Sequence, residues 1–306
     1  MKNPPVFKGV ATALVTPFYK GGIDWTSFGK LIEFQLTNGV DALVVCGTTG
    51  ECAALDVTEH AQAVDFCVRA ARGRVPVIAG AGSNDVKKAV RLAEDAALCG
   101  ASAVLAVTPY YNKATEDGLF AMYKAIAESC ALPVIIYNVP SRTGMNITPE
   151  QYARLAEIDG VRGVKEADRD VAKTVRTMAL CRDKLDIYCG NDELFLPFLS
   201  LGAAGLVSVA SNAEPALMKK LYTAFAAGDI RRAQKAQDSL APLEDALTCE
   251  VNPVPVKTLL ASRKMCREEF RLPLGKMREE NKKRLLETAA QTENCKLQIA
   301  NCKLKE

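Results

Sequence analysis

The segment PVIIYNVPSRTGMNITPEQYARLAEIDGVRGVKE (133–166) predicts one strand–helix–strand unit. It begins with a short apolar run, PVIIYN (133–138), and ends with another, VRGVKE (161–166). Both runs contain the β-branched residues that strands favour. Between them, an amphipathic stretch opens at Thr148, a residue type that caps the amino end of helices.

Six further runs of this kind occur at fairly even intervals, separated by amphipathic stretches that open at helix-capping residues. In residues 85–100, for example, Val86, Val90, Ala93 and Ala97 fall on one helical face. Eight such units in about 200 residues predict an α/β fold, and a closed (β/α)8 barrel, or TIM barrel, more strongly than an open sheet. The runs are ATALVT (11–16), ALVVCG (42–47), VPVIAG (75–80), AVLAVT (103–108), LDIYCG (185–190) and LVSVAS (206–211), and the other capping residues are Asp24, Thr58, Asn84, Thr115, Asp170 and Asp192.

The pattern changes near residue 214, after which it is helical only. We therefore expect the barrel, with the active site, in residues 1–213 and a C-terminal helical region in residues 214–290. The polar tail 291–306, in which NCKL occurs twice, is expected to be frayed or disordered.

The bulk composition excludes several classes of function. With 49% hydrophobic and 25% charged residues, the 306-residue chain resembles a globular enzyme, and its net charge of +3 gives no reason to expect nucleic acid as a partner. We expect neither export nor membrane insertion, because no leader-like segment and no run of about 18 apolar residues occurs. The 11 cysteines are odd in number and never spaced CxxC, which favours a reduced, cytoplasmic chain.

The residue types and motifs that the sequence lacks exclude several kinds of catalytic site. A single histidine, His60, cannot form a two-histidine metal site, and the chain has no GxGxxG or Walker A motif. We therefore expect neither a metal nor a cofactor. His60 lies in the helix-like stretch TEHAQAVDF (58–66), where we expect it on the helix surface or at an interface. A regulatory contact is the alternative, and a catalytic role is the least favoured.

Lys165 is the only lysine within any of the eight predicted strands. In a barrel of this type the active site lies at the carboxyl ends of the strands, where Lys165 is placed. Strand alternation puts Val161, Gly163 and Lys165 on one face, and Gly163 leaves room beside the lysine stem. An amine attacks a carbonyl only when neutral, and burial favours the neutral form. Lys165 is therefore a candidate Schiff-base residue; the alternative is a rim lysine paired with Glu166 or another acid.

Two threonines lie between glycines in GTTGE (47–51), after the second strand. Gly47 and Gly50 permit a tight turn, and Thr48 and Thr49 add hydroxyl donors, so this turn is a candidate carboxylate cradle. Loops of this composition are nevertheless common.

The strand ends also carry tyrosines and an arginine. Tyr137 is a candidate proton shuttle, although buried aromatic residues at strand ends more often serve packing. Arg142 is placed to bind a carboxylate in a bidentate manner, or to be a solvated loop residue. Tyr110 and Tyr111 are expected to be partly exposed, which suggests a subunit interface.

Six motifs, in order, resemble the dihydrodipicolinate synthase family, within the wider pyruvate-dependent aldolases. The resemblance runs from about residue 6 to residue 280, and YNVPSRTG favours this family over sialic-acid and keto-deoxy-sugar aldolases. It implies condensation of pyruvate with L-aspartate 4-semialdehyde in lysine and diaminopimelate biosynthesis, by a homotetramer arranged as a dimer of dimers. The motifs are GTTGE (47–51), TPYYN (108–112), YNVPSRTG (137–144), VKEA (164–167), CGND (189–192) and NPVPVK (252–257).

The resemblance also implies a role for each site residue. Lys165 would form the pyruvate imine, and Tyr137, Thr48 and Tyr111 would form a proton relay, with Tyr111 supplied by a neighbouring subunit. Substrate-binding roles fall to Thr49 for the pyruvate carboxylate, Arg142 for the semialdehyde carboxylate, and Gly190 and Val207 for the pocket wall.

Two positions depart from the family pattern: Asp168-Arg169-Asp170 replaces a Thr/Ser-Gly turn, and Asn191 stands where an acid is frequent. Either departure could shift the electrostatics of Lys165 or the second-substrate pocket, so the sequence defines the substrate less firmly than the mechanism. The nearest alternative is a sialic-acid or keto-deoxy-sugar aldolase that uses the same lysine. A catalytically silent barrel that binds keto acids is another.

Lysine-sensitive members of the family bind lysine in an interface cleft. The matching residues here are allosteric candidates, and Lys88 replaces an acid that would face the ligand's amines. We therefore expect weak or absent inhibition by L-lysine. The candidates are Cys52, Ala53, His60, Asn84, Lys88 and Tyr110.

Overall fold

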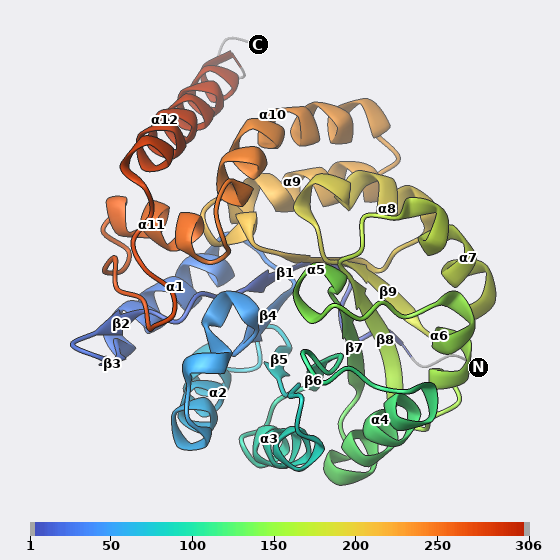
Figure 1. The fold of residues 1–306 in the computed structure, drawn as a ribbon. Helices are drawn as coiled ribbons and strands as arrows, with labels where there is room; N and C mark the ends of the chain where they lie inside the picture. The colour runs from blue at the N-terminus through green and yellow to red at the C-terminus, as the bar shows by residue number, and fades with distance from the viewer. Residues whose placement is uncertain (1–3, 303–306) are drawn as a thin grey trace.

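A computed structural model describes residues 4–302, and their side chains as far as Thr292. Eight parallel strands close into a barrel in the order β1-β10-β9-β8-β7-β6-β5-β4, with helices around the outside (Figure 1). The expected TIM barrel is confirmed. The strands are β1 (Gly9–Ala13), β4 (Ala42–Val45), β5 (Val77–Gly80), β6 (Ala103–Val107), β7 (Val134–Asn138), β8 (Val161–Glu166), β9 (Asp186–Cys189) and β10 (Gly205–Ser208).

Helices follow the strands around the barrel, and three more extend beyond it (Figure 1). Helix α9 completes the eighth strand–helix unit, because it follows β10 and packs against β1; this last unit therefore crosses residue 213. The barrel helices are α1 (Trp25–Thr37), α2 (Val57–Ala71), α3 (Val86–Leu98), α4 (Glu116–Cys130), α5 (Pro140–Thr143), α6 (Pro149–Leu155), α7 (Val171–Cys181), α8 (Phe195–Leu201) and α9 (Pro215–Ala226), and beyond them lie α10 (Ile230–Thr248), α11 (Val254–Ser262) and α12 (Glu279–Cys302).

The C-terminal tail differs from the expectation. Helix α12 continues to Cys302, across most of the stretch expected to be frayed, and residues 303–306 lie outside the described part. Leu285 and Ala289 are buried, and α12 packs against α10 and α11. Apolar contacts therefore hold a helix whose sequence is polar overall.

Four of the seven predicted caps begin a helix, and three do not. Helix α2 is capped by Asp56 in a capping box with Glu59, rather than by Thr58. Helix α3 is capped by Asp85, not Asn84. Asp192 is the first residue of a short 3-10 turn, Asp192–Leu194, and its carboxylate accepts from the backbone of residues 209 and 210.

The apolar face of α3 is also shifted from the predicted one. Val86 is 40% exposed at the start of the helix, whereas Ala89, Leu92, Ala93 and Ala96 are buried.

The core has two layers, one inside the barrel and a larger one between the strands and the helices. The predicted alternation of side chains between the two faces of β8 does not hold at the start of the strand. A register shift places Val161 in the outer layer with Val164, not on the face of Lys165. Gly163 also differs from expectation. A Cβ there would lie 2.9 Å from Asp186 O and 3.1 Å from the Tyr188 ring, so this glycine makes room for β9 rather than for the lysine stem.

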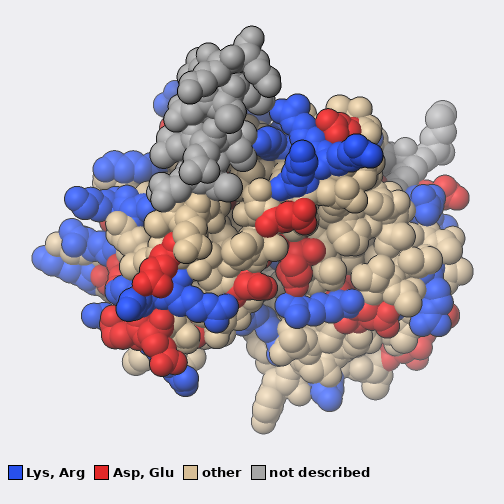
Figure 2. All heavy atoms as spheres, turned by 90° about the horizontal axis from the view of Figure 1, so that it is seen from above, with Lys and Arg blue, Asp and Glu red and all other residues tan. Residues whose placement is uncertain are grey.

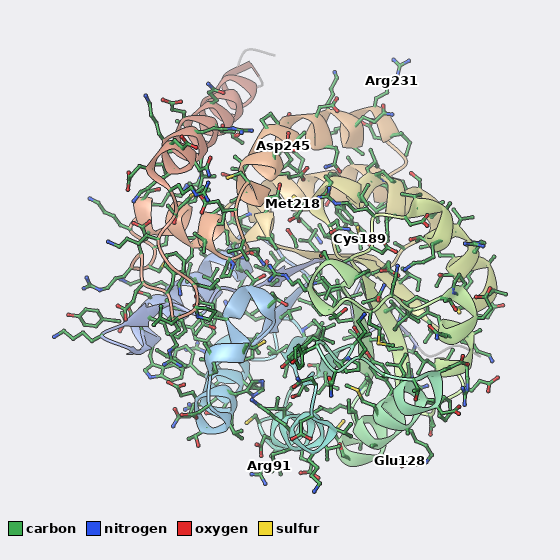
Figure 3. All side chains as sticks on the ribbon, in the orientation of Figure 1. Arg91, Glu128, Cys189, Met218, Arg231 and Asp245 are labelled. Carbon is green, nitrogen blue, oxygen red and sulfur yellow. The ribbon has the colours of Figure 1, made fainter. Side chains whose placement is uncertain are left out.

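A small hairpin, β2 (Phe18–Tyr19) with β3 (Gly22–Ile23), precedes α1 and was not predicted. Lys and Arg are interspersed with Asp and Glu over the described part of the face in Figure 2. Arg91, Glu128 and Arg231 project outward, whereas Cys189 lies near the middle of the ring of helices (Figure 3). The nine cysteines whose side chains are described are all free. Within the described chain, no helix combines the length and apolarity needed to cross a bilayer.

Candidate active site

Lys165 is buried near the carboxyl end of β8. Strand register places it between Tyr137 of β7 and Tyr188 of β9. Its side chain is only 6% exposed, and its Nζ lies 4.2 Å from the centroid of the Tyr137 ring. Among the described residues no carboxylate forms an ion pair with Lys165, because Glu166 faces the opposite side of the strand and pairs with Lys173. The alternative of a Lys165–Glu166 pair is therefore wrong.

Residues 48–50 form a 3-10 turn directly after β4. The amides of Gly50, Glu51 and Cys52 bond back to the carbonyls of Gly47 and Thr48. The amides of Thr48 and Thr49 are left at the open amino end of the turn, where they have no partner within it. The geometry therefore suits a carboxylate cradle, with Thr49 buried.

Glu51 anchors this turn to the C-terminal region. Its backbone is left-handed, with a φ of 55°, and Lys257 Nζ of α11 donates to its carboxylate at 2.6 Å. The backbone amide of Arg271 donates to the other carboxylate oxygen at 3.0 Å. Segments far apart in sequence thus fix the turn that carries both threonines.

Arg142 lies on α5, exposed to solvent. Its Nη2 donates to the backbone oxygen of Asn252 at 3.0 Å, and the Asn252 side chain donates to Thr49 Oγ1 at 3.1 Å. Asn252 therefore joins the two predicted carboxylate-binding residues. Asn252 lies in the motif NPVPVK, but the sequence predicts no role for it, because no local pattern places it beside residues 49 and 142.

The end of β9 approaches the end of β8 closely. Gly190 directly follows β9, and a Cβ there would lie 2.9 Å from the Glu166 backbone oxygen at the end of β8. The close approach of the two strand ends therefore requires glycine at position 190. The residues that depart from the family pattern lie in these two loops: Arg169 pairs with Glu193 at 2.9 Å, and Asn191 donates to the Asp168 backbone oxygen at 3.5 Å.

A cavity of about 380 Å³ opens beside these groups. Its wall includes Thr48, Tyr137, Arg142 and Asn252, together with most of the allosteric candidates. Lys165, Thr49, Gly190 and Val207 are not part of this wall; Lys165 contacts Tyr137, which is, and Val207 belongs to the same interior cluster as Tyr137.

Residues 6–292 match the model of the dihydrodipicolinate synthetase family. The chain belongs to this family. The 4-hydroxy-tetrahydrodipicolinate synthase of Syntrophus aciditrophicus is 47% identical over 280 residues, covering 92% of this chain and 96% of its own length. That of Thermodesulfovibrio yellowstonii is 45% identical over 282 residues, covering 92% and 97%. The crystal structure of dihydrodipicolinate synthase from Aquifex aeolicus superposes with a TM-score of 0.92 at 41% identity, covering 94% of this chain and 98% of that one.

In this member of the dihydrodipicolinate synthetase family, His60 is buried rather than on a helix surface. Its Nε2 is 2.6 Å from the Gly80 backbone oxygen, and no group of the described residues bonds to its buried Nδ1. Burial lowers the pKa of His60, so the ring is neutral at pH 7. With Nε2–H donating to Gly80, Nδ1 is an acceptor.

Most of the other allosteric candidates line the same cavity. Cys52, Ala53, Lys88 and Tyr110 line it, and Lys88 is exposed. Asn84 does not line it; its backbone oxygen accepts from Asn112 at 3.0 Å. Tyr110 is 36% exposed, as predicted, whereas Tyr111, at 93%, is almost fully exposed rather than partly exposed.

Proposed function

We propose that this chain is a class I aldolase-type lyase that condenses pyruvate with L-aspartate 4-semialdehyde to give 4-hydroxy-tetrahydrodipicolinate, for lysine and diaminopimelate biosynthesis. One observation carries the residue assignment: Lys165 is a buried strand lysine against the Tyr137 ring with no carboxylate partner. Family membership and synthase-named relatives favour this reaction over a sugar-acid aldolase or a silent binding barrel.

The chemistry begins when the neutral amine of Lys165 attacks the keto carbon of pyruvate and water leaves, forming an imine. Loss of a methyl proton gives an enamine, because the imine nitrogen accepts the electron pair. The enamine carbon then attacks the aldehyde carbon of the semialdehyde. The substrate's own amine next attacks the imine carbon, closes the ring and displaces Lys165, which restores the enzyme.

The remaining residues bind the substrates and transfer protons. We assign Tyr137, Thr48 and Tyr111 to a proton relay, and Thr49, with the turn amides, to the pyruvate carboxylate. Arg142, exposed at the mouth of the cavity, would bind the semialdehyde carboxylate. Gly190 and Val207 would shape the pocket beside Lys165.

We also propose a cytoplasmic homotetramer, a dimer of dimers, in which Tyr111 reaches the site of a neighbouring subunit. Two observations support this: the Tyr111 ring is 93% exposed, and its backbone φ of 69° is unusual for a bulky residue. Tyr111→Phe should lower turnover about 100-fold without changing the unfolding temperature. Sedimentation coupled to an activity assay tests the assembly; a fully active monomer would contradict it.

Borohydride trapping tests the mechanism. Reduction in the presence of pyruvate should inactivate the protein and add a pyruvyl group to Lys165. Because a modified lysine resists trypsin, residues 163–169 should then appear as one peptide carrying the added mass. An adduct on another lysine, or none, would refute the assignment.

A parallel assay tests the second substrate. Aspartate semialdehyde with pyruvate should turn over, whereas N-acetylneuraminate should not be cleaved. The opposite result would identify a sugar-acid aldolase that uses the same lysine.

A further inference from the structure

The ends of β7 and β8 carry two registered pairs of residues that face opposite sides of the barrel wall. Tyr137 and Lys165 pair in register on the inside, and Asn138 and Glu166 follow on the outside. The proposed chemistry uses only the inner pair. The outer pair is equally buried, with Asn138 0% and Glu166 2% exposed.

The carboxylate of Glu166 is saturated with partners. Its Oε1 accepts from Asn138 Nδ2 at 2.7 Å and from the Asp168 amide at 2.9 Å. Its Oε2 accepts from Tyr152 Oη at 2.9 Å and lies 3.2 Å from Lys173 Nζ. Groups from β7, α6 and α7 thus hold the residue directly after Lys165.

Lys173 is the centre of this network. Its Nζ donates to Asn146 Oδ1 at 2.6 Å and lies 2.9 Å from Asp168 Oδ2, in addition to its contact with Glu166. Asn146 also donates to Asp168 Oδ2 at 2.7 Å. Because Asn146 ends the segment 140–146 that carries Arg142, one ammonium group connects the Arg142 segment to the end of β8.

We propose that Lys173 is a positioning residue: it fixes the distance between Lys165 and Arg142. That distance determines which aldehydes can bind Arg142 through a carboxylate and still present their aldehyde carbon to the pyruvate enamine. This inference rests on the proposed function. It also gives a purpose to Asp168, one of the residues that depart from the family pattern, as the second acid that Lys173 requires.

The charges explain why Lys173 is needed. Glu166 and Asp168 contribute two negative charges, and Lys173 contributes one positive charge between them. Burial opposes ionisation of Asp168, but hydrogen bonds from Lys173 and Asn146 prevail and lower its pKa. Without Lys173, two carboxylates would face each other, and the loop after β8 would move away from the Arg142 segment.

The test replaces Lys173 with methionine, which keeps the length of the stem but removes the charge. In Lys173→Met, KM for aspartate semialdehyde should rise about tenfold, or about 1.4 kcal/mol, because Arg142 is displaced from Lys165. At saturating pyruvate, borohydride labelling of Lys165 should remain complete. Adding Asp168→Asn to Lys173→Met should recover part of the loss, because it ends the repulsion between the two carboxylates.

Lys219→Met is the matched control. Lys219 pairs with Asp41, which also binds the Val10 amide near the start of β1, at the opposite end of the barrel. This variant should lower stability without changing either KM. An aldehyde KM within twofold of the wild type in Lys173→Met, or no recovery in the double variant, would overturn the inference. If Lys173→Met fails to fold, Asn146→Ala, which removes the bond between Lys173 and the Arg142 segment, should still raise the aldehyde KM, and an unchanged KM there would overturn the inference too.

The two proposals fail in different ways. If the wild type is not labelled at Lys165 by pyruvate and borohydride, the proposed function is wrong. If the wild type is labelled but the Lys173 variants keep their aldehyde KM, only the positioning role is wrong.

Discussion

Lys165 and Lys257 are both buried lysines, but their surroundings differ. Lys257 is 0% exposed, lies 4.1 Å from the Phe18 ring, and donates to Glu51 at 2.6 Å. Lys165 likewise lies against an aromatic ring, that of Tyr137, but within the described chain no carboxylate pairs with it. Burial lowers the pKa of Lys257, and the Glu51 carboxylate opposes that shift.

Under the proposed function, the difference is one between a structural lysine and a reactive one. A carboxylate partner stabilises the ammonium form, which cannot attack a carbonyl, so the ion pair of Lys257 suits a structural role. Burial is common to both lysines; the carboxylate partner is what distinguishes Lys257 from the Schiff-base lysine that we propose.

The largest expected effect comes from Lys165→Met. Turnover should fall by at least about 10⁴-fold, because the nucleophile itself is lost, and pyruvate with borohydride should leave no adduct. Steady-state rates and peptide masses measure both. Residual labelling of another lysine in this variant would break the distinction between the two buried lysines.

Lys257→Met should instead cost stability while leaving labelling of Lys165 intact. Removing one partner of a buried ion pair typically costs about 3–5 kcal/mol, because Glu51 would keep an uncompensated charge. Urea unfolding of this variant and of Lys257→Met with Glu51→Gln measures the effect. The double variant should be the more stable of the two, since both charges are then gone.

Lys88 represents a third case, an exposed lysine that lines the cavity. If L-lysine binds here, Lys88 would repel its ammonium groups, and two charges about 4 Å apart repel by roughly 4 kcal/mol at an effective dielectric of about 20. Solvent would relieve much of this. We therefore expect weak or absent inhibition in the wild type, and in Lys88→Glu an inhibition constant lower by up to about 100-fold, or 2.7 kcal/mol.

An activity titration with L-lysine measures both proteins. Strong inhibition of the wild type at submillimolar lysine would contradict the charge argument. No change in Lys88→Glu would indicate that Lys88 is simply a solvated charge on α3.

Two buried carboxylates differ in the same way: Glu51 pairs with Lys257, whereas Glu244 has no cation partner in the described chain. Glu244 of α10 is 3% exposed, and Gln237 binds it, but no cation of the described chain does. Burial, with the charges of Asp192 and Glu193, raises the pKa of Glu244 from 4.5 to about 9. Between these values the folded chain keeps a proton that the unfolded chain releases, so stability should fall as pH rises.

Urea unfolding at several pH values between 5 and 8 tests this prediction. The slope from Glu244 should reach up to about 1.4 kcal/mol per pH unit, and Glu244→Gln should remove it. An unchanged slope in the variant would show that Glu244 is ionised in the folded protein.

Much of the site could be predicted because its residues follow strands. The eight apolar runs predicted the barrel. Because the carboxyl ends of parallel strands meet at one face of a barrel, Lys165, Tyr137 and Thr48 were predicted to lie close together. Asn252 and Lys173 could not be found this way. Each acts through partners distant in sequence: Asn252 on Thr49 and Arg142, and Lys173 on Asn146 and Glu166.

The sequence by itself determined the barrel, the family and the strand lysine, because periodicity, strand ends and ordered motifs are local properties. Only the tertiary structure decided which buried charges have partners. It turned Glu166 away from Lys165 and toward Lys173, buried His60 against Gly80, and brought Lys257 to Glu51. The physical reason is that a counter-charge acts over a few ångströms of space, and its position along the chain does not reveal that distance.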